Sequence, residues 1–129
     1  MEKSILVVDD ESELVELMKM GLEANGYQVI TASDGKAGLE TAVREKPDLI
    51  LLDLMMPEMD GYEVLRRLRR LPAMRAIPVI MLTAKRDTRS ILLTQELRAT
   101  DYFIKPFESD ALLACISKHR CSLQSPGAD

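Results

Sequence analysis

Short apolar runs alternate with longer amphipathic stretches along the whole chain. Runs rich in Val, Ile and Leu are typical of strands, whereas apolar residues spaced three and four apart are typical of helices. The predicted strands are Ile5–Val8, Tyr27–Ala32, Leu49–Asp53, Ile77–Thr83 and Tyr102–Ile104. The predicted helices run from Leu14 to a break at Asn25-Gly26, from Asp34 to about Glu45, from Gly61 to Pro72, from Asp87 to about Leu97, and from Ser109 or Asp110 onward.

Five strands that alternate with five helices predict an α/β fold with a parallel sheet and helices on both faces. The third run, Leu49–Leu52, is apolar at every position, as expected for a strand that is buried on both faces. The short connections favour a doubly wound five-stranded sheet in the order 2-1-3-4-5, the flavodoxin-like (βα)5 arrangement. In the second helix, Leu39, Ala42 and Val43 are expected to face inward.

The composition is that of a single folded domain. The chain has 129 residues, of which 47% are hydrophobic and 29% charged, so it can bury a substantial core. Residues 1–121 are predicted to form the domain, and the polar residues 122–129 a tail or the start of a linker. The net charge of −4 and the aromatic content of 4% argue against direct nucleic-acid binding by this domain.

No segment has the length and apolarity of a membrane anchor. A membrane span needs roughly 18 apolar residues, and a secretory signal has an apolar core of about 7–15 residues. The apolar strand near the N-terminus is shorter than either. Cys115 and Cys121 have no metal-ligand spacing and form no CxxC pair. A reducing, cytoplasmic setting is therefore predicted.

Polar side chains stand where four of the predicted strands end. Asp9 and Asp10 follow the first strand, Asp53 ends the third, Thr83 ends the fourth and Lys105 follows the fifth. The carboxyl ends of parallel strands share one edge of the sheet, so these groups are expected to lie together. Three neighbouring carboxylates require a cation, and hard oxygen ligands suit Mg²⁺. This pattern favours Asp53 as a nucleophile for a phosphoryl group, assisted by Lys105 and Thr83.

Each of these residues has a plainer interpretation when it is taken alone. An Asp after a strand is commonly a turn residue or a helix N-cap, a Thr can simply end a strand, and a surface Lys is usually solvated. Turn residues have no reason to place acid, acid, hydroxyl and amine on successive strands of one sheet. The joint pattern therefore carries the hypothesis.

These residues and their neighbours resemble the receiver domain of bacterial two-component response regulators, of the chemotaxis-regulator type. The resemblance covers residues 4 to about 120. The matching segments are Asp9-Asp10, Asp53-Leu-Met-Met-Pro-Glu-Met-Asp-Gly61, Thr83-Ala84-Lys85 and Tyr102-Phe-Ile-Lys105-Pro-Phe107.

The resemblance implies a phosphorelay role centred on Asp53. This residue would accept a phosphoryl group from the phosphohistidine of a cognate histidine kinase or phosphotransfer protein. Asp9 and Asp10 would bind Mg²⁺ together with Asp53 and the backbone carbonyl of Met55. Such a domain is not an enzyme in the ordinary sense, because it catalyses only its own phosphorylation and a slow autodephosphorylation.

The resemblance also implies a conformational switch. Thr83 would move its hydroxyl to the phosphoryl group, Lys105 would contact that group, and the ring of Tyr102 would turn inward. The peptide bond between Lys105 and Pro106 would be cis. The signal would leave through the face made by the fourth helix, the fifth strand and the fifth helix, which would contact an output domain or target protein or support a homodimer.

The segment from Asp87 to Thr100 departs from the family. Arg98-Ala99 stands where receiver domains commonly carry Gly-Ala, so either Arg98 adopts a left-handed backbone or the helix ends differently. One or two residues of Ile91-Leu92-Leu93 are expected to be exposed, since all three cannot face inward.

Two further features are predicted to be structural or solvated. A basic cluster is interpreted as a solvated helix face, with a docking site for an acidic partner or nucleic acid as the alternative. Its members are Arg66, Arg67, Arg69, Arg70 and Arg75. His119, the single histidine, lies near the end of the last helix, where a cation suits the helix dipole.

Three other functions share parts of this pattern. Dehalogenase-like phosphatases also use a strand-end Asp with Mg²⁺, but they carry a second Asp two residues later, where this chain has Met55. A nucleotide- or flavin-binding module would need a glycine-rich loop after the first strand, where this chain has Asp9-Asp10-Glu11. A degenerate receiver that acts only in docking would lack the acid, Thr and Lys set.

Overall fold

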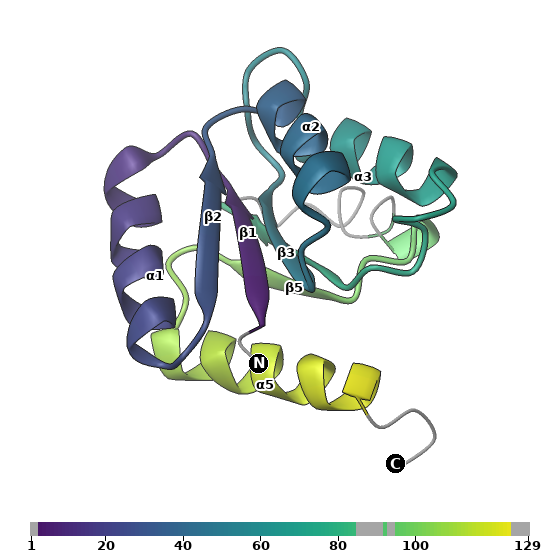
Figure 1. The fold of residues 1–129 in the computed structure, drawn as a ribbon. Coiled ribbons are helices and arrows are strands. Elements are labelled where there is room, and N and C mark those ends of the chain that lie inside the picture. Colours follow the sequence, from purple (N-terminus) through teal and green to yellow (C-terminus); the bar gives the residue numbers. More distant parts are fainter. Residues whose placement is uncertain (1–2, 85–91, 93–94, 125–129) are drawn as a thin grey trace.

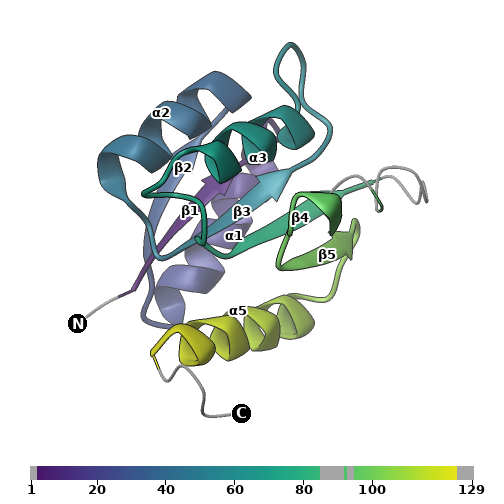
Figure 2. The same cartoon turned by 90° about the vertical axis from the view of Figure 1, so that its right-hand side faces the viewer.

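Five parallel strands form a single sheet in the order β2-β1-β3-β4-β5, as predicted (Figures 1 and 2). The computed structural model describes residues 3–84, 92 and 95–124, and for 120–124 only the backbone. The strands are β1 (Ser4–Val8), β2 (Gln28–Ala32), β3 (Leu49–Asp53), β4 (Val79–Thr83) and β5 (Asp101–Ile104). The predicted α/β class and strand order are confirmed.

Helices cover both faces of this sheet (Figure 1). The described helices are α1 (Ser12–Ala24), α2 (Gly35–Glu45), α3 (Gly61–Arg70) and α5 (Ser109–Gln124). Side chains of α1 and α5 form one apolar cluster with the sheet, and side chains of α2 and α3 form the other. None of the helices in the described part of the chain has the length and apolarity that a membrane crossing requires.

Alternation along β1 shows how the strands supply both clusters. Ile5 and Val7 pack on the α1 and α5 side, whereas Leu6 and Val8 pack on the α2 and α3 side. This follows from the two-residue period of side chains along a strand. Every residue of the central strand β3 is buried, as its continuous apolar run predicted.

The inward face of α2 differs from the prediction at Val43, whose relative exposure is 48%. The buried residues of this helix are Gly35, Gly38, Thr41 and Ala42. A Cβ at Gly38 would lie 2.7 Å from Cγ1 of Val8, so this glycine allows the helix to approach β1 closely. The buried face of α2 therefore includes Gly38 and Ala42, the latter as expected, and Val43 lies outside that face.

The predicted fourth helix, from Asp87 to about Leu97, falls mostly outside the described residues. Leu92 is described and exposed, as expected for part of this apolar run, whereas Ile91 and Leu93 lie outside the described residues. At the other end of the chain, α5 continues to Gln124, three residues past the predicted domain end at 121.

The basic cluster is not a uniformly solvated face. Arg66 and Arg67 form ion pairs with Glu63 along α3. The partly buried Arg69 instead donates hydrogen bonds to the backbone carbonyls of Ile77, Leu97 and Arg98, at 2.8–2.9 Å. Arg69 is thus a structural residue that ties α3 to the segment before β5.

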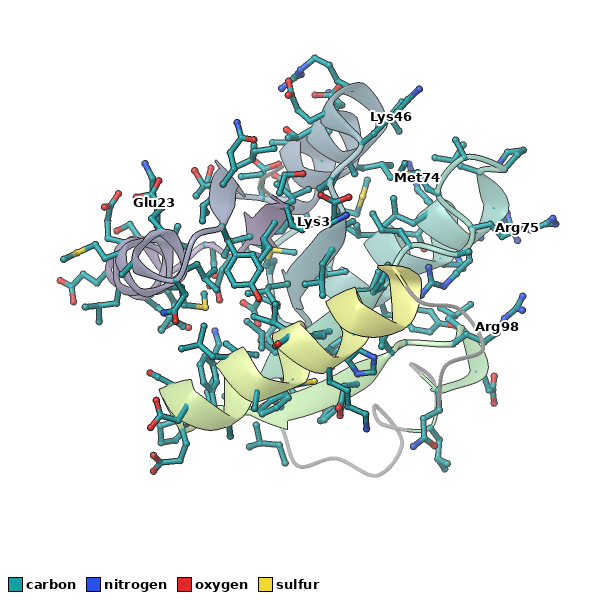
Figure 3. All side chains as sticks on the ribbon, turned by 60° about the horizontal axis from the view of Figure 1, so that its bottom comes forward. Lys3, Glu23, Lys46, Met74, Arg75 and Arg98 are labelled. Atoms are coloured by element: carbon teal, nitrogen blue, oxygen red, sulfur yellow. The ribbon has the colours of Figure 1, made fainter. Side chains whose placement is uncertain are left out.

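Arg98 adopts a left-handed backbone with φ of 60°, the first of the two predicted outcomes. Its side chain is exposed and points away from the sheet (Figure 3). We expect Arg98→Gly to raise the free energy of unfolding by about 0.5–1 kcal/mol, because Gly removes the Cβ penalty of this conformation. Thermal or chemical denaturation measures the change. Arg98→Ala is the control, since it removes the side chain but keeps the Cβ; stabilisation by both variants would assign the gain to the side chain.

Candidate functional site

The carboxyl edge of the sheet brings together side chains from four strands. Asp9 follows β1, Asp53 ends β3, Thr83 ends β4 and Lys105 follows β5. The parallel register pairs Asp53 with Leu82 and therefore sets neighbouring strand ends side by side. The site begins where the buried apolar strands end, so its polar groups lie directly next to the hydrophobic core.

Three carboxylates converge at this edge. One oxygen each from Asp9, Asp10 and Asp53 lie within 4.8 Å of one another. The relative exposure of Asp9 is 1% and that of Asp53 is 2%, whereas Asp10 is exposed. Burial and the charge of Asp9 raise the pKa of Asp53 to about 6, although Lys105 and the Met55 amide act in the opposite direction. The site thus holds a carboxylate that is costly to ionise without additional positive charge.

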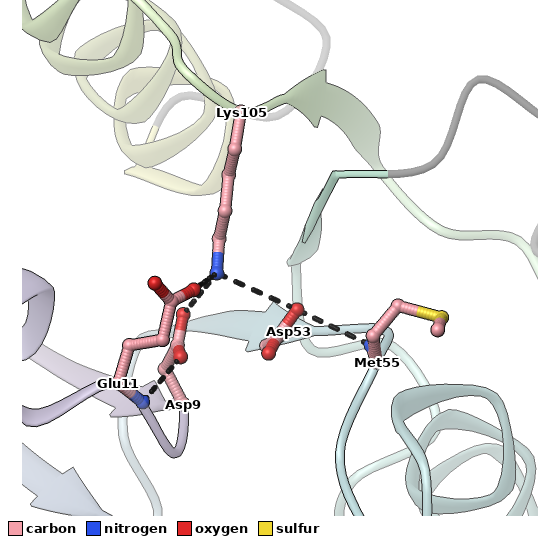
Figure 4. A network of polar contacts seen from close by, with 5 residues as sticks. All are labelled: Asp9, Glu11, Asp53, Met55 and Lys105. Atoms are coloured by element: carbon pink, nitrogen blue, oxygen red, sulfur yellow. Dashed lines mark hydrogen bonds and ion pairs between the residues drawn. The ribbon is translucent and has the colours of Figure 1, made fainter.

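Lys105 supplies one positive charge to this cluster (Figure 4). Its Nζ lies 2.8 Å from Oδ2 of Asp9, 2.6 Å from Oε1 of Glu11 and 3.6 Å from Oδ1 of Asp53. Burial acts to lower the pKa of Lys105, but the hydrogen bonds with Asp9 and Glu11 and the charge of Asp53 raise it above the ordinary value. The ammonium group therefore sits among the acids rather than in open solvent.

Glu11 is a site residue that the sequence reasoning missed. Its side chain is exposed yet reaches Nζ of Lys105, and its backbone N–H donates to Oδ1 of Asp9 at 2.9 Å. The signal available in the sequence was its position directly after Asp9-Asp10, as a third consecutive acid.

Backbone groups orient the buried acid of β3. The N–H of Met55 donates to Oδ1 of Asp53 at 3.2 Å, while the Met55 side chain is exposed. Gly61, at the start of α3, lies so close that a Cβ there would overlap the backbone oxygen of Asp53. The loop between β3 and α3 is therefore folded tightly onto the site, and only glycine fits at position 61. From the sequence, Gly61 was predicted only as the start of a helix.

Thr83 and Tyr102 lie on the two strands nearest Lys105. Thr83 is fully buried, and its backbone carbonyl accepts a hydrogen bond from the Lys105 N–H at 2.7 Å. Tyr102 is opposite Met81 in the register and packs, partly buried, against the cluster on the α2 and α3 side. The peptide bond between Lys105 and Pro106 is cis, as the resemblance implied.

The donor set fits a hard divalent cation. Among the described residues, the carboxylates of Asp9, Asp10, Glu11 and Asp53 lie near one ammonium group, that of Lys105, so negative charge is in excess there. Oxygen ligands from a small number of carboxylates, with space for water, are what Mg²⁺ prefers. An open hollow of about 320 Å³ lies beside Asp9 and Asp10, on the side of β2 and α2 rather than of Asp53.

Comparisons with known proteins agree with this geometry. The family model of the response regulator receiver domain matches residues 5–117. The chain is 52% identical over 107 residues to the alkaline phosphatase synthesis transcriptional regulatory protein PhoP of Bacillus subtilis, with 83% of this chain and 44% of that protein covered. It is 46% identical over 115 residues to the DNA-binding response regulator MtrA of Mycobacterium tuberculosis, with 88% of this chain and 49% of that protein covered. The chain thus spans about half the length of these relatives.

Solved structures show the same architecture. A CheY-like response regulator receiver domain protein from Methanospirillum hungatei superposes with a TM-score of 0.93 at 28% identity, with coverage of 98% of this chain and 100% of that one. The chemotaxis protein CheY4 of Vibrio cholerae superposes with a TM-score of 0.86 at 29% identity, with coverage of 92% and 98%.

Proposed function

We propose that this chain, which belongs to the response regulator receiver domain family, is a signalling switch that accepts a phosphoryl group on Asp53. The observation that carries the proposal is the placement of the buried Asp53 carboxylate beside Asp9 and Asp10, with the Lys105 ammonium 3.6 Å from its Oδ1. Such an arrangement combines a nucleophile with the charges that a transferred phosphoryl group needs.

The proposed reaction is an in-line phosphoryl transfer from a phosphohistidine. A carboxylate oxygen of Asp53 attacks phosphorus, the P–N bond to the donor imidazole breaks, and its electron pair returns to that nitrogen. The product is an acyl phosphate on Asp53. The donor would be a histidine kinase or a phosphotransfer protein, and the chain would act as a phosphorelay component rather than as an enzyme with turnover.

Asp9, Asp10 and Asp53 are the residues proposed to hold Mg²⁺, with the backbone carbonyl of Met55 as a further ligand. When bound, the ion would neutralise the carboxylates and the charge of the phosphoryl oxygens. The excess of carboxylates over ammonium groups supports this assignment. The raised pKa of Asp53 supports it too, because a nearby cation favours the ionised carboxylate that attacks.

The switch is proposed to use three residues around the new phosphoryl group. Lys105 would exchange part of its contact with Asp9 and Glu11 for the phosphoryl oxygens. The buried Thr83 would donate its hydroxyl to the same group, and Tyr102 would turn further inward. The output face would be that of the predicted fourth helix, β5 and α5, of which β5 and α5 lie among the described residues.

The output partner is left open in this proposal. The relatives are named as transcriptional and DNA-binding regulators, but this chain matches only about half of their length. We propose that the β5 and α5 face binds a target protein, an attached output domain or a second copy of this chain, and that this domain makes no direct contact with nucleic acid. The proposed setting is the cytoplasm, as expected from the sequence.

Incubation with a small-molecule phosphodonor and Mg²⁺ tests the proposal. We expect intact-mass spectrometry to show one added phosphoryl group, stable to acid and labile to base, and no addition to Asp53→Asn. Asp34→Asn, which changes an exposed helix-capping carboxylate, is the matched control and should be labelled normally. Labelling that persists in Asp53→Asn would overturn the assignment.

A further inference from the structure

A second group of potential metal ligands lies away from the acidic edge, between β5 and α5. It consists of Asp101 on β5 and of Cys115 and His119 on α5. One ligand atom from each of these residues lies within 4.8 Å of the others. None of the three takes part in the proposed phosphoryl chemistry.

The fold places these three side chains together before any ion binds. Cys115 and His119 are four residues apart on a helix and therefore share one face. Asp101 projects from the neighbouring strand, and its Oδ2 accepts a hydrogen bond from Sγ of Cys115 at 3.1 Å. The same oxygen lies 3.9 Å from Nε2 of His119.

The imidazole of His119 provides an independent indication of a ligand. Its Nε2 is buried, and no hydrogen-bond partner within the described part of the chain satisfies it. The distance of 3.9 Å to Asp101 is too long for a hydrogen bond. A buried polar atom without a partner is costly, so a group that binds Nε2 would relieve that cost.

We propose that Asp101, Cys115 and His119 form a binding site for a thiophilic divalent ion of the Zn²⁺ type. Sulfur, imidazole nitrogen and carboxylate oxygen are the ligands that Zn²⁺ takes in proteins. With metal–ligand bonds of about 2.0–2.3 Å, ligand atoms in a tetrahedral site lie roughly 3.3–3.7 Å apart. The separations of 3.1 Å and 3.9 Å in the structure bracket this range. Three protein ligands leave the fourth position for water or for a group from a partner.

Binding would replace a hydrogen bond by metal bonds. Sγ of Cys115 loses its proton to solvent and coordinates as the thiolate, while a ring nitrogen of His119 and a carboxylate oxygen of Asp101 supply the other two ligand atoms. Burial and the hydrogen bond to Asp101 raise the pKa of Cys115 to about 12, so the thiol keeps its proton until the ion arrives. The ion would then link the edge strand β5 to α5.

Spacing along the sequence could not have revealed this site. Cys115 and Cys121 lack the spacing of a paired zinc motif, and His119 alone is most simply a structural residue. The third ligand is Asp101, which is fourteen residues from Cys115. Only the packing of α5 against β5 brings it to the other two.

Titration of the chain with Zn²⁺, in the presence of saturating Mg²⁺, tests the proposal. The Mg²⁺ occupies the acidic edge, so we expect calorimetry to report one Zn²⁺ per chain. Cys115→Ser and His119→Gln should each weaken binding by about tenfold or more. Cys121→Ser is the matched control and should bind as the unaltered chain does. Co²⁺ in place of Zn²⁺ should give a thiolate-to-metal absorption band that only Cys115→Ser removes.

The unaltered chain offers a test that does not depend on how the variants fold. His119 is its single histidine, so one set of imidazole resonances should shift at one equivalent of Zn²⁺. Unmoved imidazole resonances, the absence of binding, or binding that both ligand variants retain would overturn the proposal. Zn²⁺ binding that is lost in Asp53→Asn instead would assign the ion to the acidic edge. Because Asp53→Asn leaves the second cluster intact, failure of the phosphoryl proposal would not affect this outcome.

Discussion

Replacing Asp53 with Asn is expected to raise the free energy of unfolding of the metal-free protein by on the order of 2 kcal/mol at pH 7. Burial and the charge of Asp9 raise the pKa of Asp53 to about 6, from 3.8 for an unperturbed side chain. The folded state therefore holds a carboxylate that would be easier to ionise in the unfolded chain. Asn removes that cost and retains an oxygen that can accept the Met55 N–H.

The expected gain depends on pH in a defined direction. Below about pH 4 the carboxyl group is protonated in both states, so the variant gains little. Between about 4 and 6 the folded state binds more protons than the unfolded state, and stability conferred by this group falls as pH rises. Above about pH 6, the difference in the free energy of unfolding between the variant and the unaltered protein is largest and no longer changes with pH.

Urea denaturation in the presence of a chelator, repeated from pH 4 to 8, measures this difference. Asp34→Asn is the control, because Asn caps a helix about as well as Asp and the group is exposed. Its stability should change by less than about 0.5 kcal/mol at every pH. A destabilised Asp53→Asn at pH 7, or a gain that does not shrink toward pH 4, would contradict the account of Asp53.

The secondary structure and the strand order were predictable because they depend on local patterns of apolar residues. The run Leu49–Leu52 is apolar at each position, and such a strand can only be central and covered on both faces. Asn25-Gly26 ends α1, with Gly26 in the left-handed region. Once the strand order follows from these patterns, the residues after each strand must share one edge, and this places Asp9 next to Asp53.

The remaining features depend on contacts between distant residues. Val43 was expected to face inward, but the buried face of α2 is the one on which Gly38 lies against Val8 of β1, and Val43 is exposed. Gly61 was predicted only as the start of a helix, whereas its actual constraint is the backbone oxygen of Asp53. The spacing of apolar residues along the sequence does not record these close approaches, so the roles of Gly38 and Gly61 follow only from the packing.

The pairing of charged side chains also could not be predicted from the order of residues in the sequence. Lys105 was assigned from its place after a strand, but its simultaneous contacts with Asp9 and Glu11 depend on side-chain reach across the sheet edge. Arg69 belongs to an arginine-rich helix, yet it differs from its neighbours because carbonyls of the segment before β5 come within its reach. The sign of a charge can be read from the sequence, but its partner cannot.

Lys105→Met is expected to lower the free energy of unfolding of the metal-free protein by about 2 kcal/mol or more. Met has a similar apolar stem but no ammonium group, so Asp9 would remain buried without its ion-pair partner at 2.8 Å. The ion pair of Lys105 with Asp9 is largely sheltered from solvent, with side-chain exposures of 12% and 0%. Removing one member of such a pair leaves the desolvation cost of the other uncompensated.

The same substitution should tighten Mg²⁺ binding by about tenfold, because Lys105 no longer competes for the carboxylates of Asp9 and Asp53. Calorimetric Mg²⁺ titration measures the affinity, and denaturation with and without Mg²⁺ should show that saturating ion recovers most of the lost stability. Lys46→Met, at an exposed lysine beyond the end of α2, is the control and should alter neither quantity. Weaker Mg²⁺ binding in Lys105→Met would mean that Lys105 organises the acidic edge for the ion rather than competing with it.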